Sequence, residues 1–403
     1  MAKHIVTGID VGDSTVKIIV AEIESGRPYP RLLTAVKNES RGFHKGSLID
    51  LPLARESVRE AIIATEKNAG VRIREAYATA GGSSLTSHTI ETNIIVSRAD
   101  SQISDLDIER LIESAASKIQ DRSNREILDV VSLFFKVDGR KILRNPVGMS
   151  GTKLEGRLLF ISTFKHDIDD LVSVIESSRV SVEKILPAPY ADSFVSASRP
   201  QKMAGCAVVD IGKDTTSCAV FEEGSVFSVE TFDVGSQNIT NDIALGFKIS
   251  LDEAEIIKTE RTSRHVPEKD LNTIVEARLS DIFELIDKHL KKIGKSELLP
   301  AGVILVGGGA SLSHIEIFAS EYLNLPARAA LPLLPHALKL PSGEGSERND
   351  VGRLSIKDPS FAGAYGLIMW AHNPPLSQSL YEEKTERRNT WGGITHLLRN
   401  FLP

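Results

Sequence analysis

The feature that most constrains this chain is a short hairpin motif that occurs twice. Residues 208–221, VVDIGKDTTSCAVF, predict an apolar strand, a tight polar turn at Asp210 and Gly212, and a second apolar strand. Residues 9–20, IDVGDSTVKIIV, repeat this pattern with an aspartate and a glycine at the matching places. Such a turn presents backbone N–H groups and hydroxyls to an anion, and its root carboxylate suits a metal-bound water. One copy alone favours an ordinary β-hairpin, whereas the repeat favours a pair of phosphate-binding turns.

Two further pairs of segments follow the hairpins in the same order. Residues 78–85, ATAGGSSL, match residues 305–312, LVGGGASL, and both predict a strand that ends in glycines. Residues 186–197, LPAPYADSFVSA, match residues 358–370, DPSFAGAYGLIMW, and both predict a helix of small residues. A chain with this repeat is expected to form two similar α/β halves that face each other across a cleft. Two facing hairpins can hold a nucleoside triphosphate and its Mg²⁺ from both sides.

Composition indicates a soluble protein of several subdomains. The 403 residues are too many for one core and predict two to four subdomains, with an ordinary hydrophobic content of 41%. The net charge of −6 and the lack of a basic run argue against a general nucleic-acid binder. The sequence enters strand 5–9 without a signal-peptide pattern, and no run approaches the ~20 apolar residues of a membrane span. We expect Cys206 and Cys218 to be small buried hydrophobes in a reducing cytosol.

These elements resemble the ATP-binding pattern of the actin, Hsp70 and sugar-kinase superfamily, and within it the FtsA family of bacterial cell-division proteins. The two Asp-x-Gly hairpins, the GGGAS turn and the two small-residue helices carry the resemblance, which covers essentially the whole chain. It implies an α/β, actin-like duplicated ATPase fold, with two halves around a nucleotide cleft, an FtsA-type α/β insertion subdomain and a C-terminal amphipathic helix. ATP and Mg²⁺ are the cofactors that it implies.

An insertion in the first half supports the more specific resemblance. About a hundred residues separate the glycine turn from the small-residue helix there, against about fifty in the second half. The excess predicts a strand at 89–96, a helix at 105–119 with Ser104 as N-cap, and strands at 130–137 and 157–164. Its segment 135–155, with VDG, NPVGMSG and LE, resembles the FtsA motif. A role in partner contacts is expected, and an insertion without a partner is the alternative. The predicted division is 1–82 with 166–198 (subdomain IA), 83–165 (insertion subdomain 1C), 199–234 with 301–373 (IIA), 235–300 (IIB), 374–388 (flexible linker) and 389–403 (membrane-targeting amphipathic helix).

The resemblance assigns the phosphates and the metal to the hairpins. Asp10 and Asp210 would organise Mg²⁺ through water, and Asp210 is also a candidate catalytic residue. Lys17 either reaches a phosphate or is a solvated strand lysine. The backbones expected to hold phosphate are those of Gly12, Asp13, Ser14 and Thr15 in the first hairpin and Gly212, Lys213, Thr215 and Thr216 in the second.

The nucleoside is assigned to the second half. Gly235 and Ser236 predict a helix start whose N–H groups are free to point at phosphate or ribose. Glu255 and Lys258 share a helix face, and they form either a surface salt bridge or, as the resemblance implies, contacts to ribose and adenine. Glycines at a strand end let a nucleotide approach the backbone closely. The remaining contacts are expected from Gly307, Gly308, Gly309 and Ser311.

Three residues bear on hydrolysis. Asp192 lies near the start of a small-residue helix, where kinases and chaperones of the superfamily carry an acidic side chain that orients the attacking group. A solvated or capping aspartate is the alternative interpretation of Asp192. Asp214 adds a negative charge where the FtsA family usually has glycine, and Ser217 stands where the family often has a carboxylate. We therefore expect ATP binding with at most weak ATPase activity.

The C-terminal residues predict a linker followed by an amphipathic helix. Residues 376–388 are polar and charged, as flexible linkers are. On a helix, the apolar residues of 389–403, NTWGGITHLLRNFLP, all fall on one side. This favours an interfacial membrane helix over docking on a protein surface, with modest attraction of Arg387, Arg388 and Arg399 to anionic lipid. The predicted membrane face is Trp391, Ile394, Leu397, Leu398, Phe401 and Leu402.

The resemblance implies a function in cell division. Such a protein polymerises with its own copies and anchors FtsZ filaments to the cytoplasmic face of the inner membrane at the division septum. Its expected partners are FtsZ, itself in a filament, anionic membrane lipid, and later division proteins that dock on the insertion subdomain. Two alternatives stay open. A pilus-assembly actin homologue would dock on a peptide rather than on lipid, and a small-molecule kinase of the superfamily would need Asp192 as its catalytic acid.

Overall fold

The computed structural model describes residues 3–24, 26–27, 29–97, 101–119, 121–142, 145–260, 266–330 and 358–374. The chain divides into two compact units, of which the first comprises Met1–His88, Asp121–Leu128 and Ile161–Pro374. The second comprises, within the described part, Thr89–Gln120 and Asp129–Phe160. The predicted terminal helix at 389–403, and the predicted linker apart from Pro374, lie outside the described residues. No helix in the described ranges is long and apolar enough to cross a membrane.

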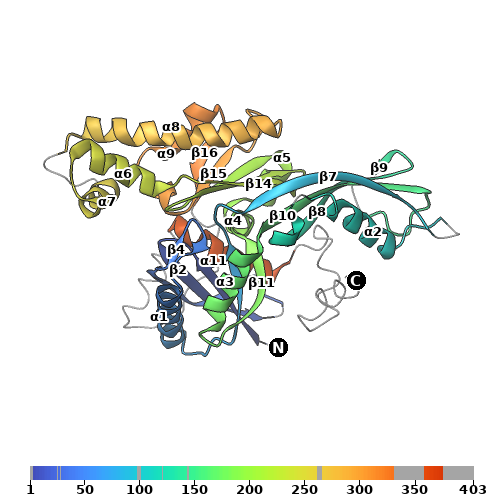
Figure 1. Ribbon diagram of the computed structural model, residues 1–403, viewed down its shortest axis with the longest axis horizontal. Coiled ribbons are helices and arrows are strands. Elements are labelled where there is room, and N and C mark those ends of the chain that lie inside the picture. The colour runs from blue at the N-terminus through green and yellow to red at the C-terminus, as the bar shows by residue number, and fades with distance from the viewer. Residues whose placement is uncertain are drawn as a thin grey trace. The chain divides into compact units, whose positions relative to one another are not determined.

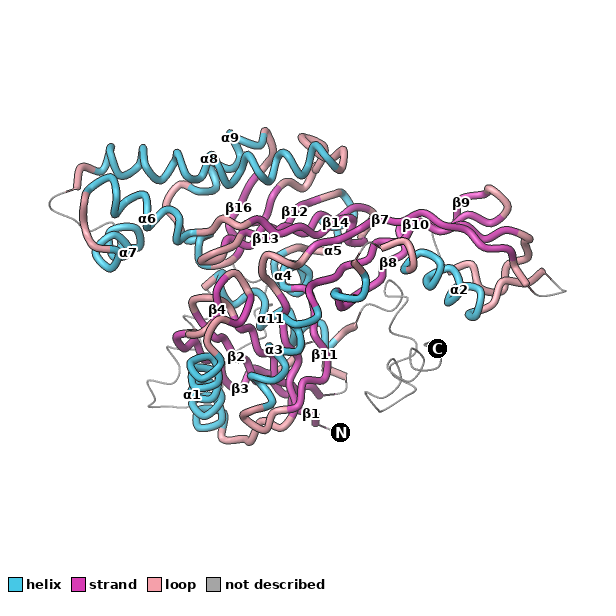
Figure 2. The backbone as a smooth tube through the Cα atoms, viewed as in Figure 1, coloured by secondary structure: helices cyan, strands magenta, loops and turns pink. Residues whose placement is uncertain are grey.

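The first half of the larger unit is built on a five-stranded sheet of order β11-β6-β1-β2-β3 (Figure 2). Strands β1 and β2 form the antiparallel hairpin predicted from residues 9–20, with Asp10 opposite Lys17. Alternate apolar residues of these strands are buried beneath two helices, α1 and α3. Asp50 caps α1 through Leu53 N at 3.0 Å, and Gly70 ends it at φ 68°. The elements are β1 (Lys3–Val11), β2 (Thr15–Glu24), β3 (Arg31–Glu39), β4 (Phe43–His44), β5 (Ser47–Leu48), α1 (Leu51–Ala69), β6 (Glu75–Ala80), α3 (Lys165–Glu176) and β11 (Ser181–Pro187).

The second half repeats this topology in a sheet of order β14-β13-β12-β15-β16. An antiparallel hairpin, β12 and β13, again stands between a third antiparallel strand and a parallel strand that ends in glycines, as the internal repeat predicts. Cys206 and Cys218 are free and fully buried within it, as expected of small hydrophobes. Helices α6 to α9 lie along this half in Figure 1 and share its core. The elements are β12 (Cys206–Ile211), β13 (Thr216–Glu222), β14 (Ser225–Phe232), α6 (Ser236–Phe247), α7 (Leu251–Glu260), α8 (Glu268–Lys292), β15 (Val303–Val306), α9 (Ile315–Leu323) and β16 (Ala327–Ala329).

Two helices of small residues join the halves, because each packs on the sheet of one half and both pack on each other. Helix α4 (Ala188–Ser196) packs on β12 and β13, and α11 (Ala362–His372) packs on β1 and β2. The two helices also pack on each other so closely that a Cβ added at Gly366 would lie 1.9 Å from the carbonyl oxygen of Ala191. This close approach requires glycine at position 366 of α11, where it meets Ala191 of α4, and it confirms the predicted pair. The short elements α5 (Arg199–Ala204) and η3 (Pro359–Phe361) follow α4 and precede α11.

The smaller unit contains the predicted insertion. Its sheet has the order β7-β10-β8-β9, and α2 buries Ile108, Leu111 and Ala115. Ser104 stands at the N-cap of α2, where its N–H and hydroxyl both donate to Asp107 Oδ2. The predicted strand–helix–strand–strand order is confirmed, whereas the short strand β9 was not predicted. The elements are β7 (Thr86–Ile95), α2 (Asp105–Ala116), η1 (Arg122–Asn124), β8 (Arg125–Val137), β9 (Arg140–Ile142) and β10 (Lys153–Phe164).

Candidate nucleotide-binding site

A cavity of about 860 Å³ lies between the two halves of the larger unit. Both hairpin turns, the second glycine turn and helices α4, α6 and α7 contribute to its walls. Its volume is within the range of small-molecule and cofactor sites. Asp10 and Asp210 line the same cavity, as a clamp made of two facing hairpins requires. The predicted nucleotide-binding residues that line it are Gly12, Asp13, Ser14, Thr15, Lys17, Gly212, Lys213, Thr215, Ser236, Glu255, Lys258, Gly307, Gly308, Gly309 and Ser311.

Each hairpin turn is closed by its own glycine. Gly12 N donates to Thr15 O at 3.1 Å, and Gly212 N donates to Thr215 O at 2.9 Å. In the described part of the chain the next two N–H groups, those of Asp13 and Ser14 and of Lys213 and Asp214, have no acceptor. Unpaired N–H groups at two turns of one cavity offer hydrogen-bond donors to an anion such as phosphate.

Three carboxylates meet near the roots of the hairpins. Asp10 accepts from Thr79 Oγ1 at 2.6 Å and from Lys17 Nζ at 2.9 Å. Burial raises the pKa of Asp210 to about 6, and the charge of Asp10 adds to the rise while Lys17 opposes it. Asp192 is 3% exposed, and burial followed by the charges of Asp210 and Asp10 raises its pKa well above its ordinary value. Its Oδ2 atom has no hydrogen-bond partner within the described ranges. The interpretation of Asp192 as a solvated aspartate is therefore wrong.

The surroundings of this cluster fit a hydrated divalent cation. Three neighbouring carboxylates, of which that of Asp192 is buried, share one lysine, so a further positive charge would stabilise their ionised forms. One oxygen of Asp192 also lacks a hydrogen-bond donor among the described residues. Mg²⁺ prefers carboxylates and keeps several of its waters, which would supply the missing donor. Within the described ranges no three His, Cys, Asp or Glu side chains are close enough to ligate one ion. The residues thus fit a Mg²⁺ ion that Asp10 and Asp210 hold through water.

Lys17 is part of this cluster rather than a solvated strand lysine. It is 8% exposed and forms an ion pair with Asp10. Burial by itself lowers the pKa of Lys17, but the charge and hydrogen bond of Asp10, with help from Asp210 and Asp358, raise it. Its charge stays in place because three carboxylates surround it, and its position on the cavity wall keeps it available to a phosphate.

At the other end of the cavity, Lys258 and Glu255 form one wall. Lys258 Nζ donates to Glu255 Oε2 at 2.7 Å, to Thr240 Oγ1 at 2.8 Å and to Ser236 O at 3.2 Å. Lys258 is only 7% exposed, so burial lowers its pKa while Glu255 opposes the change. The pair is a salt bridge, but on the lysine side it is buried and not at the surface. Glu255 keeps an exposed carboxylate that faces the cavity.

Three of the predicted residues, Thr216, Gly235 and Ser236, do not present the groups expected of them. Thr216 is fully buried, does not line the cavity, and donates from Oγ1 to Val234 O at 2.8 Å. Successive strand side chains alternate, so Thr215 and Ser217 line the cavity and Thr216 enters the core. The α6 N–H groups are also not free, because Ser236 N donates to Gly212 O and Gly235 N donates to Asn238 Oδ1. Helix α6 therefore supports the hairpin through its backbone, and only the Ser236 side of this start lines the cavity.

The predicted effect of Asp214 on phosphate is also corrected. Its carboxylate is 8% exposed and does not line the cavity. It lies 3.1 Å from Nδ1 of His44, a residue of the opposite half. An ionised carboxylate only accepts hydrogen bonds, so the ring nitrogen donates. The charge that was expected to repel phosphate is thus directed away from the cavity and paired.

Other residues of the cavity were missed because their role depends on contacts with distant parts of the chain. Thr79 lies in the first glycine segment, two residues before Gly81, but its hydrogen bond to Asp10 is visible only in the structure. Lys37 reaches Asp358 and Ser360 from β3, across more than three hundred residues of sequence. The missed lining residues include Lys37, Glu39, Phe43, Gly46, Thr79, Thr163, Asp167, Ile168, Leu171, Ser217, Gln237, Thr240, Leu312, Pro359 and Ser360.

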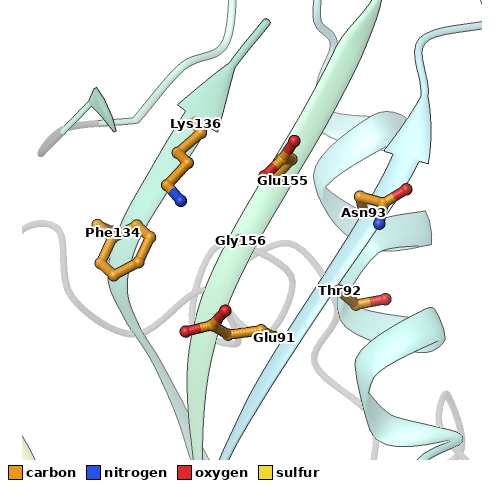
Figure 3. A pocket seen from close by; sticks show the side chains of 7 residues that line it. All are labelled: Glu91, Thr92, Asn93, Phe134, Lys136, Glu155 and Gly156. Carbon is orange, nitrogen blue, oxygen red and sulfur yellow. The ribbon is translucent and has the colours of Figure 1, made fainter. Parts of the chain in front are cut away.

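A second, smaller hollow lies on the sheet of the smaller unit. Figure 3 shows Phe134, Lys136, Glu155, Gly156 and the β7 residues around it. Its volume is about 130 Å³, well below the range of small-molecule sites. It is polar and open to solvent, and it holds neither an apolar anchor pocket nor a cluster of catalytic groups.

Comparison with known proteins identifies similar chains. A family model described as "Cell division protein FtsA" matches residues 207–366, and one described as "SHS2 domain inserted in FTSA" matches residues 82–162. The FtsA of Borreliella burgdorferi is 28% identical over 96% of each chain. The FtsA of Bacillus subtilis is 26% identical over 92% of this chain and 84% of its own.

Solved structures share the fold at lower identity. The PilM–PilN type IV pilus biogenesis complex contains a chain with a TM-score of 0.69 and 17% identity, covering 92% of this chain and 99% of that one. MreB 5 of Spiroplasma citri, in a structure bound to AMPPNP, has a TM-score of 0.51 and 11% identity, covering 99% of each chain. These likenesses show that the chain shares its fold with PilM-type and MreB chains, and the second family model covers the predicted insertion.

Proposed function

This chain belongs to the FtsA family of cell division proteins, and on that premise we propose that it binds ATP with Mg²⁺, polymerises, and anchors FtsZ filaments to the cytoplasmic membrane. The observation that carries the nucleotide part is the single 860 Å³ cavity lined by both hairpin turns and by Asp10 and Asp210. In this proposal the residues of the larger unit bind the nucleotide, and the C-terminal residues 389–403 bind the membrane.

The roles follow from where the side chains lie. The free N–H groups of the hairpin turns bind the phosphates, with Lys17 adjacent to them. Mg²⁺ would neutralise phosphate charge between Asp10 and Asp210. Lys258 orients the carboxylate of Glu255 toward the ribose and the adenine, and Ser236 lines the same end. The glycine turn at Gly307 lets the nucleoside lie against backbone.

Weak hydrolysis remains part of the proposal, with Asp192 as its candidate base. Asp192 lines the cavity beside Asp10 and Asp210, and its buried Oδ2 atom has no hydrogen-bond partner among the described residues. A carboxyl whose pKa is raised by burial and by neighbouring charges accepts a proton from water more readily than an ordinary one. Ser217 lines the cavity where the family often has a carboxylate, so one acidic group is absent and slow turnover is expected.

Binding of a fluorescent ATP analogue to the full chain, with and without Mg²⁺, tests the nucleotide part. Asp10→Asn and Asp210→Asn should remove the Mg²⁺ dependence, because each deletes one carboxylate of the ion site. Asp169→Asn, at an exposed aspartate that does not line the cavity, removes the same charge as a matched control and should bind as the unchanged chain does. Binding that is indifferent to Mg²⁺ and to both aspartates would refute the site.

Co-sedimentation with vesicles tests the membrane part. The full chain should pellet with vesicles of phosphatidylglycerol and phosphatidylethanolamine, and a chain lacking residues 389–403 should stay in the supernatant. A single short helix binds weakly, so pelleting should increase when ATP promotes polymerisation. FtsZ should pellet with the vesicles only in the presence of the full chain. Equal pelleting of both chains would contradict the anchor and favour the pilus-type alternative, in which the tail does not bind lipid.

The proposed place of action follows from these partners. A protein that binds FtsZ and lipid at once acts at the cytoplasmic face of the inner membrane, at the septum. Later division proteins are proposed to dock on the insertion subdomain, within residues 83–165. The predicted division into subdomains IA, 1C, IIA and IIB belongs to the same proposal. A small-molecule kinase would instead show phosphotransfer that depends on Asp192, and a phosphotransfer screen distinguishes the two.

A further inference from the structure

One loop of the first half connects the two phosphate hairpins. We call residues 43–48, which form β4, β5 and their turn, the bridging loop. Gly46 N donates to Asp13 Oδ1 at 2.9 Å, which ties the loop to the first hairpin. Ser83 N donates to Lys45 O at 3.0 Å, which ties it to the first glycine turn. A Cβ added at Gly46 would lie 2.4 Å from Gly82 Cα, so the loop is packed tightly against that turn.

From this anchored position the bridging loop reaches the opposite half. His44 Nδ1 lies 3.1 Å from Asp214 Oδ2, and Lys45 Nζ lies 3.7 Å from Asp233 Oδ2. Asp214 belongs to the turn of the second hairpin, where two neighbouring N–H groups have no acceptor within the described ranges. The Asp214 carboxylate is 8% exposed, so its pairing with the imidazole is partly shielded from water. The two hairpin turns are thus joined through Asp13, the bridging loop and His44.

We infer that His44 and Asp214 are positioning residues for the nucleotide: their contact holds the two phosphate hairpins together, and the charge on His44 sets how slowly a bound nucleotide leaves. Neither side chain lines the cavity, so neither touches the phosphates. They act through the backbone of the turns that do. The inference rests on the proposed binding of ATP in this cavity, and it adds a residue pair that fixes nucleotide retention.

The sign of the effect follows from the charges that face His44. A protonated imidazole attracts a carboxylate more strongly than a neutral one does, and histidine is the side chain whose charge most readily changes near neutral pH. Asp13 and Asp233 add negative charge nearby, and Lys45 and Lys213 add positive charge. Burial raises the pKa of Asp13, and the hydrogen bond from Gly46 N opposes this rise. The charge of Asp214 adds to the rise, and the charges of His44 and Lys213 oppose it. Asp13 is therefore the one neighbour whose own titration must be separated from that of His44.

Dissociation of the fluorescent ATP analogue, chased with excess ATP at pH 6 and pH 8, tests the inference. The unchanged full chain should release it about two to five times more slowly at pH 6, as a partly exposed ion pair allows. His44→Gln and Asp214→Asn should each abolish this pH difference, and the double variant should add nothing further. His44→Lys keeps a charge at both pH values and should release slowly at both. His314→Gln, an exposed histidine in the same unit, is the control and should keep the pH difference.

A second measurement does not need the nucleotide. In the protein without nucleotide, hydrogen–deuterium exchange of the segment 206–222 should increase in His44→Gln, although the substitution is in the other half, and not in His314→Gln. Unchanged exchange overturns the inference that the contact between His44 and Asp214 holds the hairpins together, whether or not ATP binds. Altered exchange without any ATP binding supports that contact and refutes the proposed function. A pH difference that persists in His44→Lys assigns the titration to Asp13 and overturns the role of His44.

Discussion

Replacing Gly366 by alanine should destabilise the larger unit at the contact between α4 and α11. The added Cβ would lie 1.9 Å from the carbonyl oxygen of Ala191 and 2.4 Å from its carbon. A carbon in contact with a carbonyl oxygen normally stays about 3.3 Å or more away, so the helices would have to separate by about 1.4 Å. The obstacle is backbone, which cannot rotate away as a flexible side chain does.

The cost can be set against the gain in helix propensity. Overpacking a close-packed interior costs about 1–3 kcal/mol, and a backbone obstacle places this site at about 3 kcal/mol. Alanine in a helix interior is favoured over glycine by about 1 kcal/mol. The net loss of about 2 kcal/mol should lower the melting temperature by about 2 °C in a chain of this length, because the entropy of unfolding grows with the number of residues.

Thermal unfolding followed by calorimetry measures this difference, with Gly363→Ala as the matched control. Gly363 is in the same helix, gains the same propensity, and would place its Cβ no closer than 3.3 Å to Asp10 Cγ. It should melt at the unchanged temperature or slightly above it. Equal melting temperatures for the two alanine variants would show that α4 and α11 are not in backbone contact, and the account of how the two helices join the halves would be wrong.

Four further substitutions test the site. Asp192→Asn should raise the melting temperature of the nucleotide-free chain at pH 8 and not at pH 4. Burial and the charges of Asp210 and Asp10 raise the pKa of Asp192 in the folded chain, so its ionised form destabilises the fold only above the pKa of about 4 that it has when unfolded. An equal gain at both pH values would point to packing instead of charge. Thr216→Val removes the hydrogen bond to Val234 O and should lower the free energy of unfolding in chemical denaturation by about 1 kcal/mol, while the affinity for the ATP analogue stays unchanged. Thr215→Val, at a residue that lines the cavity, should lower that affinity several-fold. Gly235→Ala places a Cβ 2.3 Å from Lys213 O, which should shift the second hairpin turn and weaken equilibrium binding of the ATP analogue about ten-fold. Unchanged affinity would show that the backbone of this turn moves aside at no cost.

Much of the architecture was predictable because the chain is an internal repeat. The two hairpins, the two glycine-ended strands and the two small-residue helices are each specified by residues that are neighbours in sequence, through alternation in strands and the helical period. The insertion was predictable for the same reason, except for β9, which has only three residues and little pattern of its own. Most of the phosphate-binding turn residues line the cavity, because a tight turn places its backbone without help from distant parts of the chain.

The sequence alone therefore determined the repeated elements, their order and the two turns that the cavity brings together. Only the tertiary structure decided which polar side chains are buried and what they pair with. Thr216 enters the core because of its parity in β13, Lys17 is neutralised by Asp10, and the carboxylate of Asp214 pairs with a histidine 170 residues away. Local patterns record the hydrophobic period of a segment. They carry no information on which charged side chain of a distant segment will lie beside a carboxylate. That partner decides whether the carboxylate of Asp214 repels a phosphate or pairs with the opposite half.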